Sequence, residues 1–201
     1  MSLADTQYLG IIENILDKVN HLIIGGGMAY TFIKAQGGKI GNSICEDDKQ
    51  ELALDILAKA KAKGVEVHLP IDVVAADAFD NNAKTQVVPV NAVPDGWEGL
   101  DAGPKTLENI RQVLLKSKTI LWNGPVGVFE MPNFAKGTIG VCESIANLTD
   151  AVTIIGGGDS AAAAISLGYA DKFTHISTGG GASLEFLEGK VLPGVEAISN
   201  K

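Results

Sequence analysis

Three consecutive glycines followed by an aspartate and a serine form the stretch of this sequence with the clearest capacity for chemistry. The apolar run Val152–Ile155 predicts a buried strand, and Gly156–Gly158 come directly after it. Glycines allow a sharp turn and a close approach to a ligand. Asp159 and Ser160 stand where helix-capping residues are expected, and a helix starting there would direct free N–H groups at an anion. A carboxylate and a phosphate repel each other unless a metal cation lies between them, so the loop predicts a magnesium-bound phosphate ligand.

Glycine-bearing loops recur after other predicted strands. They are residues 25–27, 124–127, 156–158 and 179–181. Strands that alternate with helices in this way form a parallel sheet covered on both faces, so the predicted fold is α/β, a Rossmann-like three-layer α/β/α arrangement. The carboxyl ends of parallel strands share one edge, and we expect all four loops to open there.

The remaining periodicity defines the elements that would position these loops. Apolar spacing predicts helices at residues 9–19, 28–36, 47–63, 105–117, 134–148 and 184–188, with another beginning near Asp159. Short apolar runs predict strands at residues 21–24, 65–69, 119–122, 152–155 and 173–176. Residues 72–91 alternate β-formers with turn residues, which indicates a small hairpin at the edge of the sheet.

Composition narrows the class of protein. The chain has 201 residues and a formal net charge of −8, with no basic stripe, which argues against wholesale binding of nucleic acid or anionic membrane. No apolar run is long enough to span a membrane and no signal peptide is visible. Cys45 and Cys142 lie far apart without metal-site spacing, as expected for reduced thiols. These features predict a globular cytoplasmic protein.

Two other functions fit parts of the pattern. No P-loop is present, but Gly156-x-Gly158-x-x-Ala161 fits the looser dinucleotide fingerprint, so an NAD-binding Rossmann domain of a dehydrogenase is one alternative. Against it, the strand at residues 173–176 ends without the acid that would bind the NAD ribose. The second alternative is a non-catalytic fragment that docks a partner domain.

Several polar residues have both a structural and a functional interpretation. Asp159 is either a helix N-cap or a metal ligand, and Glu130 is either an ordinary surface acid or a ribose ligand. The histidines His21, His68 and His175 stand singly in or beside apolar strands. We expect them to be structural residues of the core or the sheet edge.

Five motifs together resemble phosphoglycerate kinase. They are Ile23–Ala29 (IIGGGMA), Leu121–Glu130 (LWNGPVGVFE), Ile154–Ser160 (IIGGGDS), Ser177–Glu185 (STGGGASLE) and Glu188–Val195 (EGKVLPGV). Their order and length make the resemblance specific, and it extends over nearly the whole chain. It is confined to the nucleotide-binding, C-terminal domain of that family.

The resemblance implies a domain, an activity and partners. Residues 10–201 would be the nucleotide-binding domain, which binds Mg²⁺ with ATP or ADP. Residues 1–9 would be an atypical leading segment or a cloning remnant. The whole enzyme transfers a phosphoryl group reversibly between 1,3-bisphosphoglycerate and ADP in glycolysis and is typically monomeric. The domain that binds 3-phosphoglycerate has no counterpart here, and residues 1–9 carry neither of two family lysines that contact phosphates. We therefore expect the chain alone to lack turnover.

The resemblance also assigns roles to individual residues. Asp159 would hold the magnesium, Glu130 would bind the ribose, and Asn123 would face the transferring phosphoryl group together with the glycines at 179–181. The adenine slot would be formed by Gly25, Gly26, Ile44, Gly103 and Val128. The phosphates would lie against Gly157, Gly158 and Ser160, and the nucleotide would also contact Pro125 and Gly127 of the loop at 124–127. The residues expected to act at the reacting phosphate are Gly157, Gly180 and Gly181.

Overall fold

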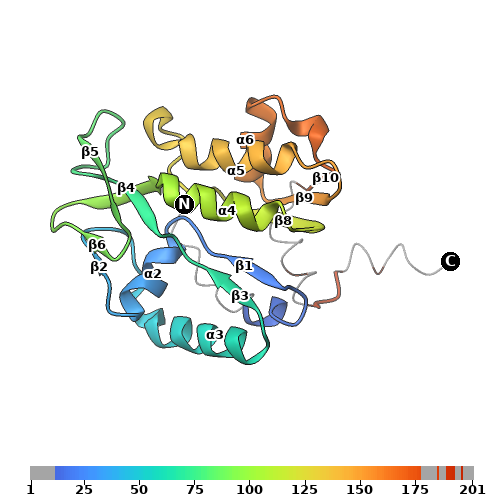
Figure 1. Ribbon diagram of the computed structural model, residues 1–201, viewed down its shortest axis with the longest axis horizontal. Coiled ribbons are helices and arrows are strands. Elements are labelled where there is room, and N and C mark those ends of the chain that lie inside the picture. Colours follow the sequence, from blue (N-terminus) through green and yellow to red (C-terminus); the bar gives the residue numbers. More distant parts are fainter. Residues whose placement is uncertain (1–11, 178–184, 186–188, 193–195, 197–201) are drawn as a thin grey trace.

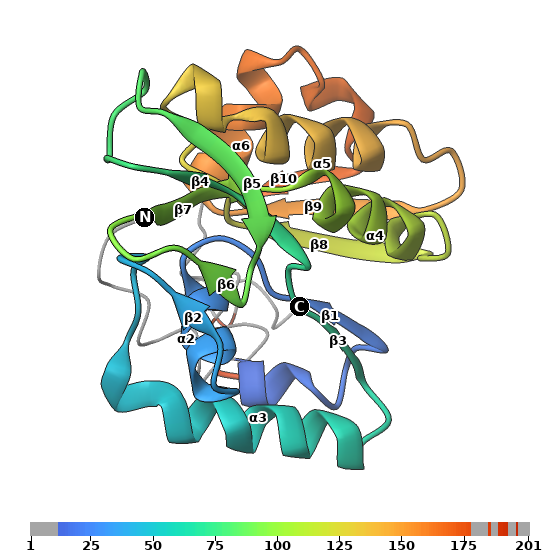
Figure 2. The same ribbon diagram turned by 60° about the vertical axis from the view of Figure 1, so that its left-hand side comes forward.

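Helices lie on both sides of a central layer of strands (Figures 1 and 2). The computed structural model describes residues 12–177, 185, 189–192 and 196. One side carries α4 (Pro104–Leu114), α5 (Lys136–Ala146) and α6 (Gly158–Ser166), and the other carries α2 (Met28–Ala35) and α3 (Gln50–Ala62). The predicted α/β class, with helices on both faces of parallel strands, is confirmed.

The parallel strands form two hydrogen-bonded ladders. In the first, β1 (His21–Ile23) pairs with β3 (Glu66–His68). In the second, the order is β10-β9-β8, with bounds His175–Ser177, Val152–Gly156 and Thr119–Asn123. Each strand lies within a few residues of its predicted position. Within the described part of the chain no ladder joins the two groups, so the single sheet expected from sequence is observed as two ladders.

A separate antiparallel sheet flanks the parallel strands. Its order is β5-β4-β7, from β4 (Asp72–Ala76), β5 (Thr85–Pro89) and β7 (Glu98–Ala102). The predicted hairpin is thus correct, but β7 was not expected because its sequence, EGLDA, contains a glycine and two acids. Two short strands, β2 (Lys39–Ile40) and β6 (Ala92–Val93), pair with each other beside it.

Two apolar clusters fill the space between strands and helices. One joins α4–α6 to β8 and β9 through buried side chains that include Ile110, Trp122, Ile145 and Ile155. The other joins α2 and α3 to the first ladder through Ile24, Phe32 and Ile56 among others. Burial of these apolar side chains stabilises the packing of the helices against both faces of the strand layer.

Helix boundaries follow the capping chemistry of the sequence. Pro104 is the first residue of α4, where its missing N–H costs nothing. The helix expected at residues 47–63 begins instead as a 3₁₀ turn, η1 (Asp47–Lys49), and continues as α3. Similarly, η2 (Pro132–Phe134) precedes α5, and η3 (Ala170–Lys172) precedes β10. Of the helix expected at 9–19, residues 12–15 are helical and residues 16–18 form a turn, so the helix ends four residues early; residues 9–11, and all but residue 185 of the helix expected at 184–188, lie outside the described residues.

Two further sequence expectations concern cysteines and membranes. Cys45 and Cys142 are both free thiols, and Cys142 is buried beside the core of α5. No helix among the described residues has the length and hydropathy needed to cross a bilayer.

Candidate functional site

The register of the second ladder brings the ends of three strands to one edge. Asn123, the last residue of β8, lies opposite Gly156, the last residue of β9, and Gly156 lies opposite Ser177 at the end of β10. The Gly157 N–H donates to the Ser177 carbonyl at 3.1 Å, which continues the pairing one residue further. The chain therefore leaves all three strands at the same level, as parallel strands predict.

Gly157 makes the turn from β9 into α6. Its φ is +95°, and a Cβ at this position would lie 2.6 Å from Asn123 Oδ1, so only glycine fits. Gly157 also occupies the N-cap position of α6, and no side chain caps the helix. The interpretation of Asp159 as an N-cap is therefore wrong, because Asp159 falls within the first turn instead. The free N–H groups of that turn remain available to an anion.

The side chains of Asp159 and Ser160 lie in different environments. Asp159 is exposed, and the structure shows no hydrogen bond or ion pair from its carboxylate to any described residue. Ser160 is fully buried, and its Oγ accepts a hydrogen bond from the Gly124 N–H at 2.7 Å. Ser160 thus ties the start of α6 to the loop after β8, while Asp159 presents a carboxylate to solvent.

The loop after β8 is held by main-chain contacts. Gly124 has a φ of +99°, and its carbonyl accepts a hydrogen bond from Trp122 Nε1 at 2.9 Å. Further along, the Val128 N–H donates to the Leu100 carbonyl of β7 at 2.8 Å. Gly127 packs so closely on Asp101 that a Cβ would overlap its carboxylate. Pro125 is buried within the same loop.

The loop after β1 lies beside the loop after β8. A Cβ at Gly25 would lie 2.9 Å from Val126 Cγ1, and one at Gly27 would lie 2.8 Å from Ile44 Cγ2. Gly26 has a φ of +63°. The Ile44 side chain is 45% exposed. Two glycine loops and an exposed apolar side chain therefore meet, as an adenine slot would require.

Two of the expected residues lie at the margin of this arrangement. Gly103 is buried against Asp72, and its N–H donates to the Asp72 carbonyl at 3.0 Å, so it joins β7 to β4. Its neighbours Asp101 and Ala102 line a cavity of about 20 Å³ together with Gly25 and Gly26. Glu130 is exposed in the turn that follows the loop after β8. The positions expected at Gly180 and Gly181 lie outside the described residues.

Asp101 is the residue of this region that sequence reasoning missed. It is 3% exposed, and burial raises the pKa of its carboxyl to about 6, although the N–H groups of Gly137 and Ala102 donate to it and oppose the rise. Burial is also the main reason that the pKa of the nearby Tyr30 phenol is raised, with the charge of Asp101 adding to it. The close packing of Gly127 and Gly137 on Asp101 was hidden because the three residues are far apart in sequence.

The donor set suits an anion with a hard cation better than other ligands. The loop after β1 and the first turn of α6 supply backbone N–H groups, and a Cβ at Gly157 would fill the space beside Asn123. One exposed carboxylate, that of Asp159, accompanies them. Magnesium is commonly held by one or two carboxylates together with ligand phosphates, so these residues fit a magnesium-bound phosphate ester.

Comparison with known proteins gives a consistent result at the level of family. The sequence profile of the phosphoglycerate kinase family matches residues 6–190. A phosphoglycerate kinase of Fusobacterium nucleatum is 65% identical over 193 residues, which are 96% of this chain and 48% of that protein. The chloroplastic phosphoglycerate kinase of Volvox carteri is 56% identical over 193 residues, or 95% of this chain and 42% of that protein.

Solved structures show the same similarity in three dimensions. The phosphoglycerate kinase of Coxiella burnetii has a TM-score of 0.91 at 42% identity, covering 96% of this chain and 50% of that one. That of Pyrococcus horikoshii has a TM-score of 0.80 at 29% identity, covering 98% and 50%. The chain spans about half the length of the relatives it matches.

Proposed function

Because the chain belongs to the phosphoglycerate kinase family, we propose that residues 10–201 are its nucleotide-binding domain and bind Mg-ADP or Mg-ATP at the glycine-rich edge. The observation that supports this most strongly is the common register of Asn123, Gly156 and Ser177, because it makes the three strands end side by side. A ligand bound there meets main-chain donors from several loops at once.

Each part of the ligand has a counterpart among these residues. The phosphates lie against Gly157 and Gly158, where the N–H groups of the first turn of α6 orient them. Ser160, which accepts from Gly124, is a positioning residue that fixes the loop relative to the helix. The exposed side chain of Ile44 and the Gly25–Gly27 loop provide the apolar slot for the base.

Acidic residues complete the binding set. The Asp159 carboxylate binds the magnesium ion, which neutralises phosphate charge when it is present. The Glu130 carboxylate accepts hydrogen bonds from the ribose hydroxyls. Both side chains are exposed, so neither has to give up a protein partner in order to bind.

In the whole enzyme this domain would serve reversible phosphoryl transfer between 1,3-bisphosphoglycerate and ADP. Such a transfer asks the protein mainly for positioning and for stabilisation of charge on the moving group. The loops described above supply donors, whereas cationic side chains would come from parts of the enzyme that this chain does not resemble. We therefore expect the chain alone to bind nucleotide weakly and to show no turnover in a coupled kinase assay. Normal rates in that assay would contradict the proposal.

Thermal melting distinguishes the proposal from the dehydrogenase alternative. A ligand at 100 times its dissociation constant adds about 2.7 kcal/mol to the free energy of unfolding. For a domain of this size that raises the melting temperature by roughly 5–10 °C. Mg-ADP should produce such a shift and NAD should not, and the opposite pattern would favour the dinucleotide-binding alternative.

The role of Asp159 can be separated from a general charge effect. Asp159→Asn should weaken ADP binding about tenfold or more when magnesium is present and leave metal-free ADP binding unchanged or slightly tighter. The matched control is Asp171→Asn, which removes another exposed acid from the first turn of a short helix, η3. Equal weakening with and without magnesium would exclude Asp159 as the metal ligand.

A further inference from the structure

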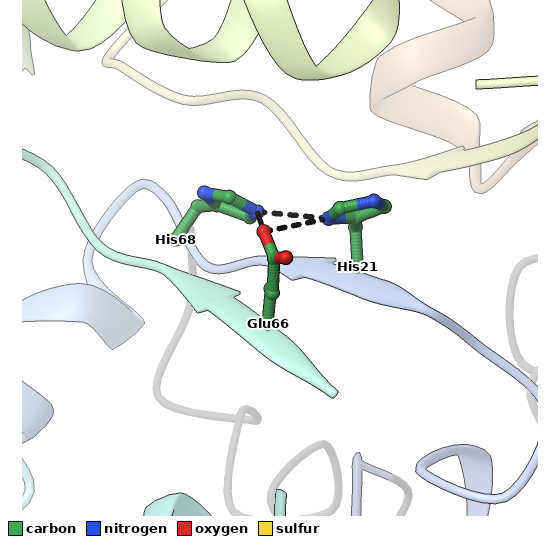
Figure 3. A group of neighbouring side chains, drawn as sticks. All are labelled: His21, Glu66 and His68. Carbon is green, nitrogen blue, oxygen red and sulfur yellow. Dashed lines mark hydrogen bonds and ion pairs between the residues drawn. The ribbon is translucent and has the colours of Figure 1, made fainter. Parts of the chain in front are cut away.

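Two histidines and a glutamate come together on the first parallel ladder (Figure 3). His21 begins β1, and the register places it opposite Glu66 of β3. His68 lies two residues further along β3, opposite Ile23. The sequence interpretation of His21 and His68 as isolated structural residues is therefore incomplete, because the fold makes them neighbours.

Strand alternation places all three side chains on one face of the ladder. Residues two apart on a strand share a face, so Glu66 and His68 lie on the same side as His21. Leu22 and Val67, between them, face the opposite way and pack into the clusters around α2 and α3. The apolar contacts on one face thus fix the backbone that presents the polar group on the other.

The distances within the group match those of a metal centre. His21 Nδ1 lies 3.2 Å from His68 Nε2 and 3.4 Å from Glu66 Oε2, and His68 Nε2 lies 3.8 Å from the same carboxylate oxygen. Ligand atoms about 2.05 Å from a tetrahedral zinc ion are separated from one another by roughly 3.3 Å. Three atoms on three side chains are therefore arranged at close to the edge length of a zinc tetrahedron.

We propose that His21, Glu66 and His68 bind a divalent transition-metal ion, zinc above all. Two imidazole nitrogens with one carboxylate oxygen form a ligand set that zinc uses, with a fourth position open to water or another ligand. Magnesium and calcium prefer oxygen ligands only, so the ion that accompanies a nucleotide would not occupy this site. This inference does not depend on the proposed nucleotide-binding function.

The group is accessible without being fully exposed. The side chains of His68, His21 and Glu66 are 15%, 35% and 70% exposed. His68 also lines the small cavity that β1 and β3 share with α4, whereas the Glu66 side chain is largely exposed. Two partly buried imidazoles and one exposed carboxylate provide both preorganisation and an entry path.

An ordinary hydrogen bond between the two rings would give the same short contact without metal. The N–H of one neutral imidazole can donate to the bare nitrogen of the other ring. The Glu66 carboxylate can accept from whichever ring nitrogen carries a proton. The short contact fits both a hydrogen bond between the rings and a metal site, and a metal-binding measurement distinguishes the two.

Binding would add a side-chain cross-link to a short ladder. β1 and β3 pair over three residues, and β1 leads directly into the glycine loop at 25–27. A metal ion shared by His21, Glu66 and His68 adds a cross-link between the strands at that point. The expected consequence is a stabilised first ladder.

The test is a zinc titration of the metal-free chain, using competition with a chromophoric zinc indicator. The measurements are made in a Cys45→Ser background, because the partly exposed Cys45 thiol could bind zinc independently. We expect one zinc per monomeric chain, no competition from millimolar magnesium, and a rise in melting temperature of about 5–10 °C at a hundredfold excess of zinc over its dissociation constant. No binding, or one zinc shared by two chains, would overturn the proposal.

Variants identify the ligands. His68→Gln and Glu66→Gln should each weaken zinc binding at least tenfold, since loss even of groups that only support a metal ligand costs 10–100-fold. His175→Gln is the matched control, because His175 is an exposed strand histidine outside the group. Glu66 is largely exposed, so its variant keeps the fold even if His68→Gln does not. Zinc affinity that is the same in Glu66→Gln, His175→Gln and the parent chain would show that zinc binds elsewhere.

Discussion

The glycine-rich edge and the His21–Glu66–His68 group use parallel strands in opposite ways. At the carboxyl ends the chain presents main-chain N–H groups, and side chains serve mainly to hold the loops, as Ser160 holds Gly124. On the first ladder the main chain only pairs the two strands, and three side chains form the site. Strand β1 takes part in both, since His21 is its first residue and Gly25 follows shortly after its last.

The difference lies in how each site is encoded. The main-chain site depends on contiguous stretches, because a loop must turn sharply and then start a helix within a few residues. The side-chain site depends on register, because His21 and Glu66 are 45 positions apart and meet only when β1 pairs with β3. A single sequence therefore reveals the first kind of site and conceals the second.

The largest expected effect concerns the support beneath the glycine-rich edge. The pKa of Asp101 is about 6 when folded and 3.8 without the fold, so between these pH values the folded chain binds a proton that the unfolded chain releases. The free energy of unfolding contributed by Asp101 therefore falls as pH rises from about 4 to about 6, by roughly 3 kcal/mol for a two-unit shift. Asp101→Asn removes this dependence.

Urea unfolding of the parent and Asp101→Asn chains across this pH range measures the effect. Other carboxylates titrate in both chains, so their contributions cancel in the difference. The free energy of unfolding of the parent should therefore rise relative to that of Asp101→Asn as pH falls from 7 to 4. Profiles that run parallel would mean that Asp101 is not a buried carboxylate under the Gly127 loop. Zinc affinity at neutral pH should be the same in both chains.

The next prediction concerns the turn that opens α6. Gly157→Ala should cost about 1–3 kcal/mol of stability, because alanine is strained at a φ of +95° and its Cβ meets Asn123. Gly168→Ala, at the other end of α6, imposes a φ of +73° in open space and should cost about 1–2 kcal/mol. Only Gly157→Ala should weaken Mg-ADP binding, by about tenfold or more, as measured by calorimetric titration. Similar affinities in the two variants would separate the turn from the ligand.

A smaller effect is expected from the hydroxyl that ties α6 to the loop after β8. Ser160→Ala leaves the Gly124 N–H without its acceptor and should lower the free energy of unfolding by about 1–2 kcal/mol. Ser166→Ala removes a hydroxyl that donates only within α6, to the Ala163 carbonyl, and should change it by less than about 0.5 kcal/mol. Chemical denaturation of both variants gives the comparison, and equal losses would rule out a special role for Ser160.

The smallest effect is the one expected between the two sites. Zinc on the first ladder and Mg-ADP at the glycine-rich edge use different atoms, so each should leave the affinity of the other within about twofold. Titrating Mg-ADP with and without saturating zinc measures this coupling. A change of tenfold or more would mean that β1 transmits a structural change from His21 to Gly25, and the two regions would then have to be treated as one.

The sequence predicted most of the fold because its elements are locally marked. Apolar runs such as Val152–Ile155, helix-stopping glycines and Pro104 at the start of α4 gave strand and helix positions within a few residues. The strand β7 was missed because Glu98–Ala102 has no strand composition, and it forms because β4 offers a partner. The two-ladder arrangement was likewise invisible, since pairing is a property of the assembled sheet.

The candidate site was predictable to the extent that it is contiguous. The glycine loops were located from sequence, and the structure brings Gly25, Val126, Asn123 and Gly157 into adjacent loops. The capping role of Asp159 was misjudged, because Gly157 takes the N-cap with a backbone conformation that residue type alone does not indicate. Asp101 went unnoticed because its burial arises from segments far apart in the chain.

The most direct test of the account follows the main-chain amides themselves. In a two-dimensional ¹⁵N–¹H NMR titration with Mg-ADP, the largest shift changes should fall on the amides of residues 25–27, 124, 126–128 and 156–160, while the signals of the Glu66 and His68 amides should not shift. Changes concentrated elsewhere, for example on the outer faces of α4 and α5, or the same response to NAD as to Mg-ADP, would contradict nucleotide binding at the glycine-rich edge.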